Sequence, residues 1–144
     1  MPELPEVTAL VDDLRRRAGG RIALRFQVFA FAALKTVEIP PQALAGLRID
    51  GVDRHGKFLD LRLGETHLII HLARAGWIRW RDEAPTTPVR PGKSPLAARL
   101  VLSEEDGAAA GCLDITEAGT KKSLALYLVR DPAEVPGIAR LGPD

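Results

Sequence analysis

The sequence is poor in several residue types, and each scarcity excludes a class of protein. Its 144 residues include one cysteine, Cys112, and aromatic residues make up only 5%. A single thiol excludes an internal disulfide framework and a metal site built on several thiolates, and we expect Cys112 to be a small buried residue. No apolar run approaches the ~18 residues of a membrane-spanning helix, and the N-terminus has no cationic, apolar leader. We therefore expect a cytoplasmic protein without a membrane partner.

Net charge is also small, at +1, but it is unevenly distributed. Residues 51–100 hold nine Lys and Arg against five Asp and Glu, whereas residues 101–144 hold four against eight. Any basic footprint for a nucleic acid is therefore expected in the middle third. Hydrophobic residues at 46% and charged residues at 27% are ordinary for one globular domain. These proportions exclude a disordered tail, a collagen-like repeat and a coiled coil.

The first segment has the periodicity of a helix. Apolar residues recur at helical spacing at Val7, Leu10, Val11, Leu14 and Ala18. Pro5 suits a first helical turn, and the carboxylates of Glu3 and Glu6 suit the positive end of the helix dipole. Gly19-Gly20 is expected to end the helix.

After Gly20 the period changes to two, which predicts strands. The expected strands are Arg21–Ala30, Leu47–Val52, Lys57–Leu63, His67–Leu72, Trp77–Arg81, Ala97–Leu102, Cys112–Thr116 and Ser123–Val129. Asp82–Pro95 is expected to be a long loop, and Asp131 to cap a short helix that Pro136-Gly137 ends. The pattern predicts a mostly β (α+β) fold, a two-sheet antiparallel β-sandwich or barrel with an N-terminal helix and a short C-terminal helix.

The proline after the initiator methionine carries the most chemical information. Removal of Met1 would expose Pro2 as a secondary amine, and an α-amino pKa of about 7.7–8.0 leaves part of it neutral at physiological pH. Such an amine can attack a sugar carbon and form an iminium, which is an electron sink. Many proteins begin Met-Pro, so this feature alone leaves the chemistry open. Glu3 and Glu6 can exchange protons with the amine or a leaving oxygen, or simply complement the helix dipole.

The string Pro2–Val7 resembles the N-terminal signature of the Fpg/Nei family, the formamidopyrimidine-DNA glycosylases. Three further segments resemble family motifs in the same order: Arg54–Leu59, His71–Gly76 and Arg140–Asp144. The resemblance extends over essentially all of residues 1–144 and corresponds to the family's N-terminal catalytic domain. It implies a bifunctional DNA glycosylase/AP lyase of base excision repair that removes oxidised bases.

The resemblance also implies roles for individual residues. Pro2 would attack the anomeric carbon of the damaged nucleotide, and Glu3 would protonate the ring oxygen. Glu6 would line the pocket near the lesion, and Lys57 would contact a phosphate beside the reacting sugar. The iminium would then permit β-elimination and δ-elimination, which nick the strand. The implied partner is damaged double-stranded DNA, whose lesion must leave the base stack.

DNA contacts are expected from six side chains: Arg54, His55, His71, Arg74, Lys121 and Lys122. Two segments depart from the family pattern. Arg74 stands where the family commonly has a methionine that fills the gap left by the flipped nucleotide, and Thr116–Lys122 replaces a segment with an aromatic wedge. The lesion preference, oxidised purine or oxidised pyrimidine, therefore stays open. These charges also have a plainer interpretation as solvated turn residues.

The family's second half, a helix-two-turn-helix region usually followed by a zinc finger, is absent from these 144 residues. No cofactor is expected in this chain, because His67 and His71 lack a third metal ligand. We expect a monomer in a bacterial-type cytoplasm, associated with the nucleoid. Alone it should be weak or inactive, since phosphate contacts dominate DNA affinity. Two alternatives stay open: a catalytically silent damaged-DNA-binding module and a β-rich interaction domain.

Overall fold

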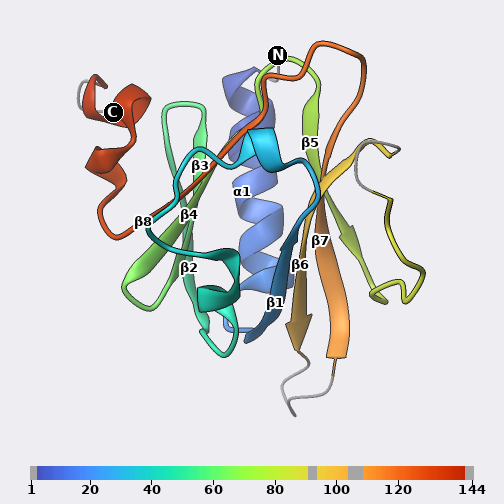
Figure 1. The fold of residues 1–144 in the computed structure, drawn as a ribbon. Coiled ribbons are helices and arrows are strands. Elements are labelled where there is room, and N and C mark those ends of the chain that lie inside the picture. The colour runs from blue at the N-terminus through green and yellow to red at the C-terminus, as the bar shows by residue number, and fades with distance from the viewer. Residues whose placement is uncertain (1–2, 91–93, 104–108, 142–144) are drawn as a thin grey trace.

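The computed structural model of the chain describes residues 3–90, 94–103 and 109–141. Two four-stranded antiparallel sheets and one long helix enclose its core (Figure 1). The helical elements are α1 (Leu4–Ala18), η1 (Phe31–Ala33), η2 (Pro41–Leu44), η3 (Pro132–Glu134) and α2 (Pro136–Ala139). The strands are β1 (Ala23–Val28), β2 (Ile49–His55), β3 (Phe58–Leu63), β4 (Thr66–His71), β5 (Gly76–Arg81), β6 (Leu96–Ser103), β7 (Ala109–Glu117) and β8 (Ala125–Val129). The predicted class, a mostly β sandwich with an N-terminal and a short C-terminal helix, is confirmed.

Helix α1 forms because one face is apolar and both ends carry matching signals. The residues predicted to share that face are all buried: Val7, Leu10, Val11, Leu14 and Ala18. Glu3 is the N-cap, and a carboxylate oxygen of Glu6 accepts the Glu3 backbone amide at 3.2 Å. This bond satisfies a donor at the helix start. Gly20 follows the helix with φ +83°, a conformation that glycine adopts without strain.

The sheets have the strand orders β1-β6-β7-β5 and β2-β3-β4-β8. Their boundaries differ from the predicted ones by a few residues at most strands. For example, β1 begins at Ala23 rather than at Arg21, because Ile22 makes only an isolated bridge to Arg48. Between β5 and β6, the described parts of the predicted long loop contain no helix or strand.

Strand β3 shows how alternation builds the core. Leu59, Leu61 and Leu63 are fully buried and join the cluster that both sheets and α1 share. Because successive side chains point to opposite faces, Asp60 belongs to the outer face of the sheet. A buried carboxylate on that face needs hydrogen-bond partners, which the candidate site supplies.

The C-terminal segment covers part of this outer face. The prediction that Pro136-Gly137 ends the helix capped by Asp131 is wrong. Asp131 caps η3 as predicted, accepting the Ala133 amide at 2.9 Å, but Pro136 begins α2 because a fixed φ suits the first turn. Gly137 lies so close to the Phe58 ring that an added Cβ would be 2.5 Å from Phe58 Cζ. A small second cluster results, made of Phe58, Ile69, Tyr127, Val129, Val135 and Ile138.

No helix of the part of the chain that the structure describes is long and apolar enough to cross a membrane. Cys112 is fully buried, as predicted, and burial, followed by the nearby charge of Asp114, raises the pKa of its thiol to about 11. It therefore stays a protonated, inert thiol at neutral pH.

Candidate functional site

The elements that carry the described site residues come together at the end of the sandwich where α1 begins (Figure 1). Three connections meet there: the β2–β3 hairpin, the β4–β5 turn and the β7–β8 loop. The Ala118 amide of the β7–β8 loop donates to the Ala75 carbonyl of the β4–β5 turn at 3.3 Å, which ties two of these connections together. The chain thus brings segments far apart in sequence to one edge.

Glu3, Glu6 and Lys57 are brought together at the start of α1. Lys57 Nζ lies 3.9 Å from Glu3 Oε2, and the two side chains are 36% and 74% exposed. An ion pair this exposed adds little stability, so its importance is the position it marks. Pro2, the predicted nucleophile, lies outside the described residues.

The β2–β3 hairpin positions Lys57. Its two-residue turn begins with Gly56 at φ +58°, a conformation that favours glycine, and His55 pairs with Phe58 across it. Arg54 donates from Nη1 to the Gly56 carbonyl at 3.2 Å, which braces the turn. Lys57 is thereby carried to the hairpin tip beside Glu3.

His55, predicted to contact DNA, is engaged by a carboxylate that the sequence reasoning missed. Asp60 is buried on the outer face, and it lies 2.8 Å from His55 Nε2 and 2.8 Å from His67 Nδ1. Each carboxylate oxygen thus faces one imidazole. The signal was a polar residue between two buried leucines of a strand, but its partners come from neighbouring strands and could not be read from spacing.

His71 lies close enough to Lys57 for the lysine charge to affect its pKa. Its ring packs against Phe58 with centroids 4.7 Å apart. Burial, and then the positive charge of Lys57, lowers the pKa of His71. The imidazole is therefore neutral at physiological pH, so it offers a single N–H to a phosphate rather than a charge.

Arg74 is exposed on the β4–β5 turn. The turn closes through the Gly76 amide, which donates to the Leu72 carbonyl at 2.9 Å. Ala73 has φ +57°, the one positive value for a non-glycine residue in the described ranges. Such a backbone costs of order 1 kcal/mol or more and often lies beside functional side chains. The turn projects Arg74 at the same edge as Lys57.

The two lysines of the β7–β8 loop differ in their surroundings. Glu117 is buried, and its Oε2 accepts the backbone amides of Ser123 and Leu124, both at 2.8 Å. Both lysines are exposed, but Lys122 donates from Nζ to the Glu117 carbonyl at 2.7 Å and so braces the loop. The sequence showed Glu117 only as one residue of Thr116–Lys122, and this clamp was missed.

Metal-binding chemistry is not evident at this edge. Among the residues that the structure describes, no three His, Cys, Asp or Glu side chains gather as metal ligands. The expectation that this chain holds no cofactor stays a prediction. The same holds for the DNA-contacting roles of Arg54, His55, His71, Arg74, Lys121 and Lys122.

Comparison with known proteins shows which family the chain resembles. The family model described as the formamidopyrimidine-DNA glycosylase N-terminal domain matches residues 1–120. Formamidopyrimidine-DNA glycosylase of Protochlamydia amoebophila is 34% identical over 148 aligned residues, and that of Geobacter sulfurreducens is 34% identical over 149. Each alignment covers 100% of this chain but 49% of the relative. The chain thus spans about half the length of these curated relatives.

A solved structure shares the fold. It is Lactococcus lactis formamidopyrimidine-DNA glycosylase bound non-covalently to DNA with an abasic site, with a TM-score of 0.80 and 22% sequence identity. The match covers 99% of this chain and 52% of that one. A second L. lactis Fpg structure, a complex with an abasic-site DNA, matches with a TM-score of 0.77 over 96% of this chain and 48% of that one, at 23% identity. Because the family model matches residues 1–120 and the curated relatives align with the whole of this chain, the chain belongs to the formamidopyrimidine-DNA glycosylase family.

Proposed function

We propose that this chain is the catalytic half of a bifunctional DNA glycosylase/AP lyase that removes oxidised bases in base excision repair. The observation that carries the proposal is the distance of 3.9 Å between Lys57 Nζ and Glu3 Oε2. Glu3 is the residue that directly follows Pro2. Membership of the formamidopyrimidine-DNA glycosylase family supports it. A carboxyl, an ammonium and an N-terminal amine at one place are the groups that iminium chemistry on a sugar requires.

Pro2 would act as the nucleophile once Met1 is removed. Its neutral nitrogen would form a bond to C1′ of the damaged nucleotide, the bond from C1′ to the base would break, and the base would leave with its bonding electrons. Glu3 would protonate the ring oxygen, so that the C1′–O4′ bond opens to an iminium. Loss of a C2′ proton would then expel the 3′ phosphate, which is β-elimination. A second elimination at the 5′ side would release the remaining sugar.

Glu6 has a specific part in this proposal. The amide that its carboxylate accepts belongs to the peptide bond between Pro2 and Glu3. The hydrogen bond therefore holds the backbone immediately after the proposed nucleophile. A catalytic group must be held in a productive geometry before it reacts, since orientation contributes much of the rate.

Damaged double-stranded DNA is the proposed partner. Lys57, Arg74 and Lys121 would contact phosphates from three different connections at the same edge. His71 would add a neutral hydrogen-bond donor, and Arg54 and His55 would lie on the hairpin beside them. Because phosphate contacts release counterions, binding should weaken steeply as salt is raised.

The chain matches about half the length of each curated relative. We propose that residues 1–144 are the catalytic domain, and that further DNA-binding regions of the helix-two-turn-helix and zinc-finger type supply much of the grip in complete relatives. The chain alone should then bind DNA weakly and turn over slowly. Monomeric state, absence of a cofactor, and a location at the nucleoid in the cytoplasm stay predictions.

Borohydride trapping on abasic-site DNA tests the proposal. The sample is first shown by intact mass to lack Met1, and a preparation that retains Met1 is the control, because its Pro2 nitrogen is an amide. A covalent adduct from the processed chain alone supports the lyase. Salt-dependent binding without an adduct would favour a silent damaged-DNA-binding module, and no binding at all would favour a β-rich interaction domain.

A further inference from the structure

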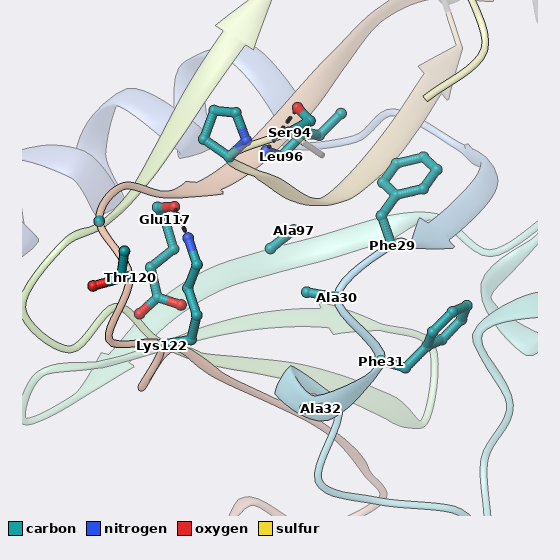
Figure 2. Close-up of a pocket in the computed structure, with 12 residues that line it drawn as sticks. Phe29, Ala30, Phe31, Ala32, Ser94, Leu96, Ala97, Glu117, Thr120 and Lys122 are labelled. Atoms are coloured by element: carbon teal, nitrogen blue, oxygen red, sulfur yellow. Dashed lines mark hydrogen bonds between the residues drawn. The ribbon is translucent and has the colours of Figure 1, made fainter. Parts of the chain in front are cut away.

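A cavity of about 820 Å³ opens between η1 and the β7–β8 loop, and no step of the proposed reaction uses it. Two phenylalanines lie on one side, and polar side chains lie on the other (Figure 2). The lining includes Phe29, Phe31, Ala32, Ala97, Thr120 and Lys122. The volume and the mostly apolar lining are those of a site for a flat organic group.

Phe31 is unusual for its exposure. It is 74% exposed at the start of η1, although a large apolar side chain is normally covered. Figure 2 shows Ala30 and Ala97 between the phenylalanines and the loop, where small side chains leave room for a ring. An aromatic face beside an open space can serve as a stacking platform.

Basic groups stand at the rim of the cavity. Lys35 donates from Nζ to the Ala32 carbonyl at 2.7 Å, and Lys122 is held on the Glu117 carbonyl. The acidic lining residue, Glu117, has its carboxylate engaged by two loop amides, at Ser123 and Leu124. Two ammonium groups thus lie close to the cavity, Lys122 in its lining and Lys35 on the carbonyl of the lining residue Ala32. Aromatic platforms with basic borders bind single-stranded nucleic acid, because bases stack while the ammonium groups contact phosphate.

The cavity adjoins the candidate site. The Ala118 amide of its loop bonds to the Ala75 carbonyl, one residue from Arg74. We infer that this cavity takes one unstacked nucleobase of the bound DNA, stacked on Phe31, with Lys35 and Lys122 near its phosphates. The inference rests on the proposed function, and it adds a second base subsite to it. A base within an intact duplex is already stacked on both faces, so the occupant is a base at an unpaired position.

The test uses the 144-residue chain with two DNA probes that both contain an abasic site. One carries an unpaired 2-aminopurine beside that site, and the other carries the same 2-aminopurine fully paired. Two variants address the cavity: Phe31→Ala removes the platform, and Ala32→Trp fills the space while keeping Phe31. Val37→Ala is the matched control, because Val37 is 92% exposed on the same connection and does not line the cavity.

The unchanged chain should bind the unpaired probe more tightly than the paired one and quench its fluorescence. Phe31→Ala and Ala32→Trp should each weaken binding of the unpaired probe by roughly 5- to 100-fold and abolish the quenching, since a stacked base contributes that much. Both should leave the paired probe within about twofold, as should Val37→Ala with either probe. Phe31→Trp should restore binding, because any large ring can stack.

Equal binding of the unpaired probe by the unchanged chain and both cavity variants overturns the inference while leaving the proposed function intact. Failure of the unchanged chain to bind either probe overturns both. Competition by free deoxynucleoside monophosphate at millimolar concentration, with no preference for the unpaired probe, would also overturn it, since the site would then take free nucleotides rather than DNA.

Discussion

The carboxylate of Glu6 accepts the backbone amide of Glu3 at 3.2 Å, and that amide is the one that joins Glu3 to Pro2. Glu6, expected to line a lesion pocket, to exchange protons or to complement the helix dipole, thus also holds the peptide next to the proposed nucleophile. One contact serves both the stability of α1 and the alignment of the site. The two effects can be separated by substitutions that keep or remove the acceptor oxygen.

We predict that Glu6→Ala lowers the yield of borohydride-trapped adduct and costs about 0.5–2 kcal/mol of the free energy of unfolding, as the loss of a helix cap does. Glu6→Gln keeps an acceptor oxygen and should retain most of both. Trapping yield and urea unfolding measure the two quantities. A Gln variant as inactive as the Ala variant but fully stable would show instead that the charge of Glu6 takes part in the chemistry.

Lys57→Ala should leave stability within about 0.5 kcal/mol, because the ion pair with Glu3 is exposed. DNA affinity should fall, and the slope of log K against log salt should decrease by about 0.9, the value of one lost phosphate contact. Titrations at several salt concentrations measure it. Arg48→Ala is the control, since Arg48 is exposed beside Ile22, away from the start of α1. Equal slope changes in both variants would contradict a specific role for Lys57.

Asp60→Asn should destabilise the fold by about 1–3 kcal/mol, because a buried acceptor pair for two imidazoles is replaced by a group that offers one acceptor. Urea unfolding measures this loss. His67→Gln, which removes one partner only, should cost less. If Asp60→Asn unfolds at the same urea concentration as the unchanged chain, the two hydrogen bonds contribute no net stability.

Asp114, on the outer face of the β1-β6-β7-β5 sheet, should make the free energy of unfolding depend on pH. Burial alone would raise the pKa of Asp114, but hydrogen bonds from Arg99, with Cys112 and Arg81, hold it below its ordinary value of 3.8. Because the pKa is lowered in the folded state, the ion pair contributes its full stability above pH 3.8 and loses it as pH falls through the folded-state value. Asp114→Asn should cost about 3–5 kcal/mol at pH 7, since it leaves Arg99 buried without its charge partner. The difference between the two proteins should narrow below about pH 4 in unfolding titrations, and a constant difference would contradict this account.

Much of the fold follows from periodicity. The apolar spacing from Val7 to Ala18 predicts α1 and its buried face, and alternation predicts the strands with small boundary errors. Pro136 was predicted to end a helix, but it begins α2. The local sequence does not distinguish a proline that ends one helix from a proline that begins another. The close approach of Gly137 to the Phe58 ring belongs to the packing that the local sequence does not show.

The site was predictable where its residues lie in short recognisable motifs. Glu3 and Glu6 come from one short string, and Lys57 comes from a hairpin tip. Asp60 was missed because its hydrogen-bond partners, His55 and His67, come from two other strands. Glu117 was missed because its partners are backbone amides across a loop. Backbone acceptors and donors carry no signal in the amino-acid sequence, so such clamps become visible only in three dimensions.

The measurement that tests the central claim most directly is the position of the trapped sugar on the chain. The processed protein is reduced with borohydride on abasic-site DNA, digested with nuclease and protease, and its modified peptide is identified by mass spectrometry. The account predicts that the added mass lies on the N-terminal nitrogen of Pro2 and is absent when Met1 is retained. A modified Lys57, Lys121 or Lys122, with an unmodified N-terminal peptide, would contradict it.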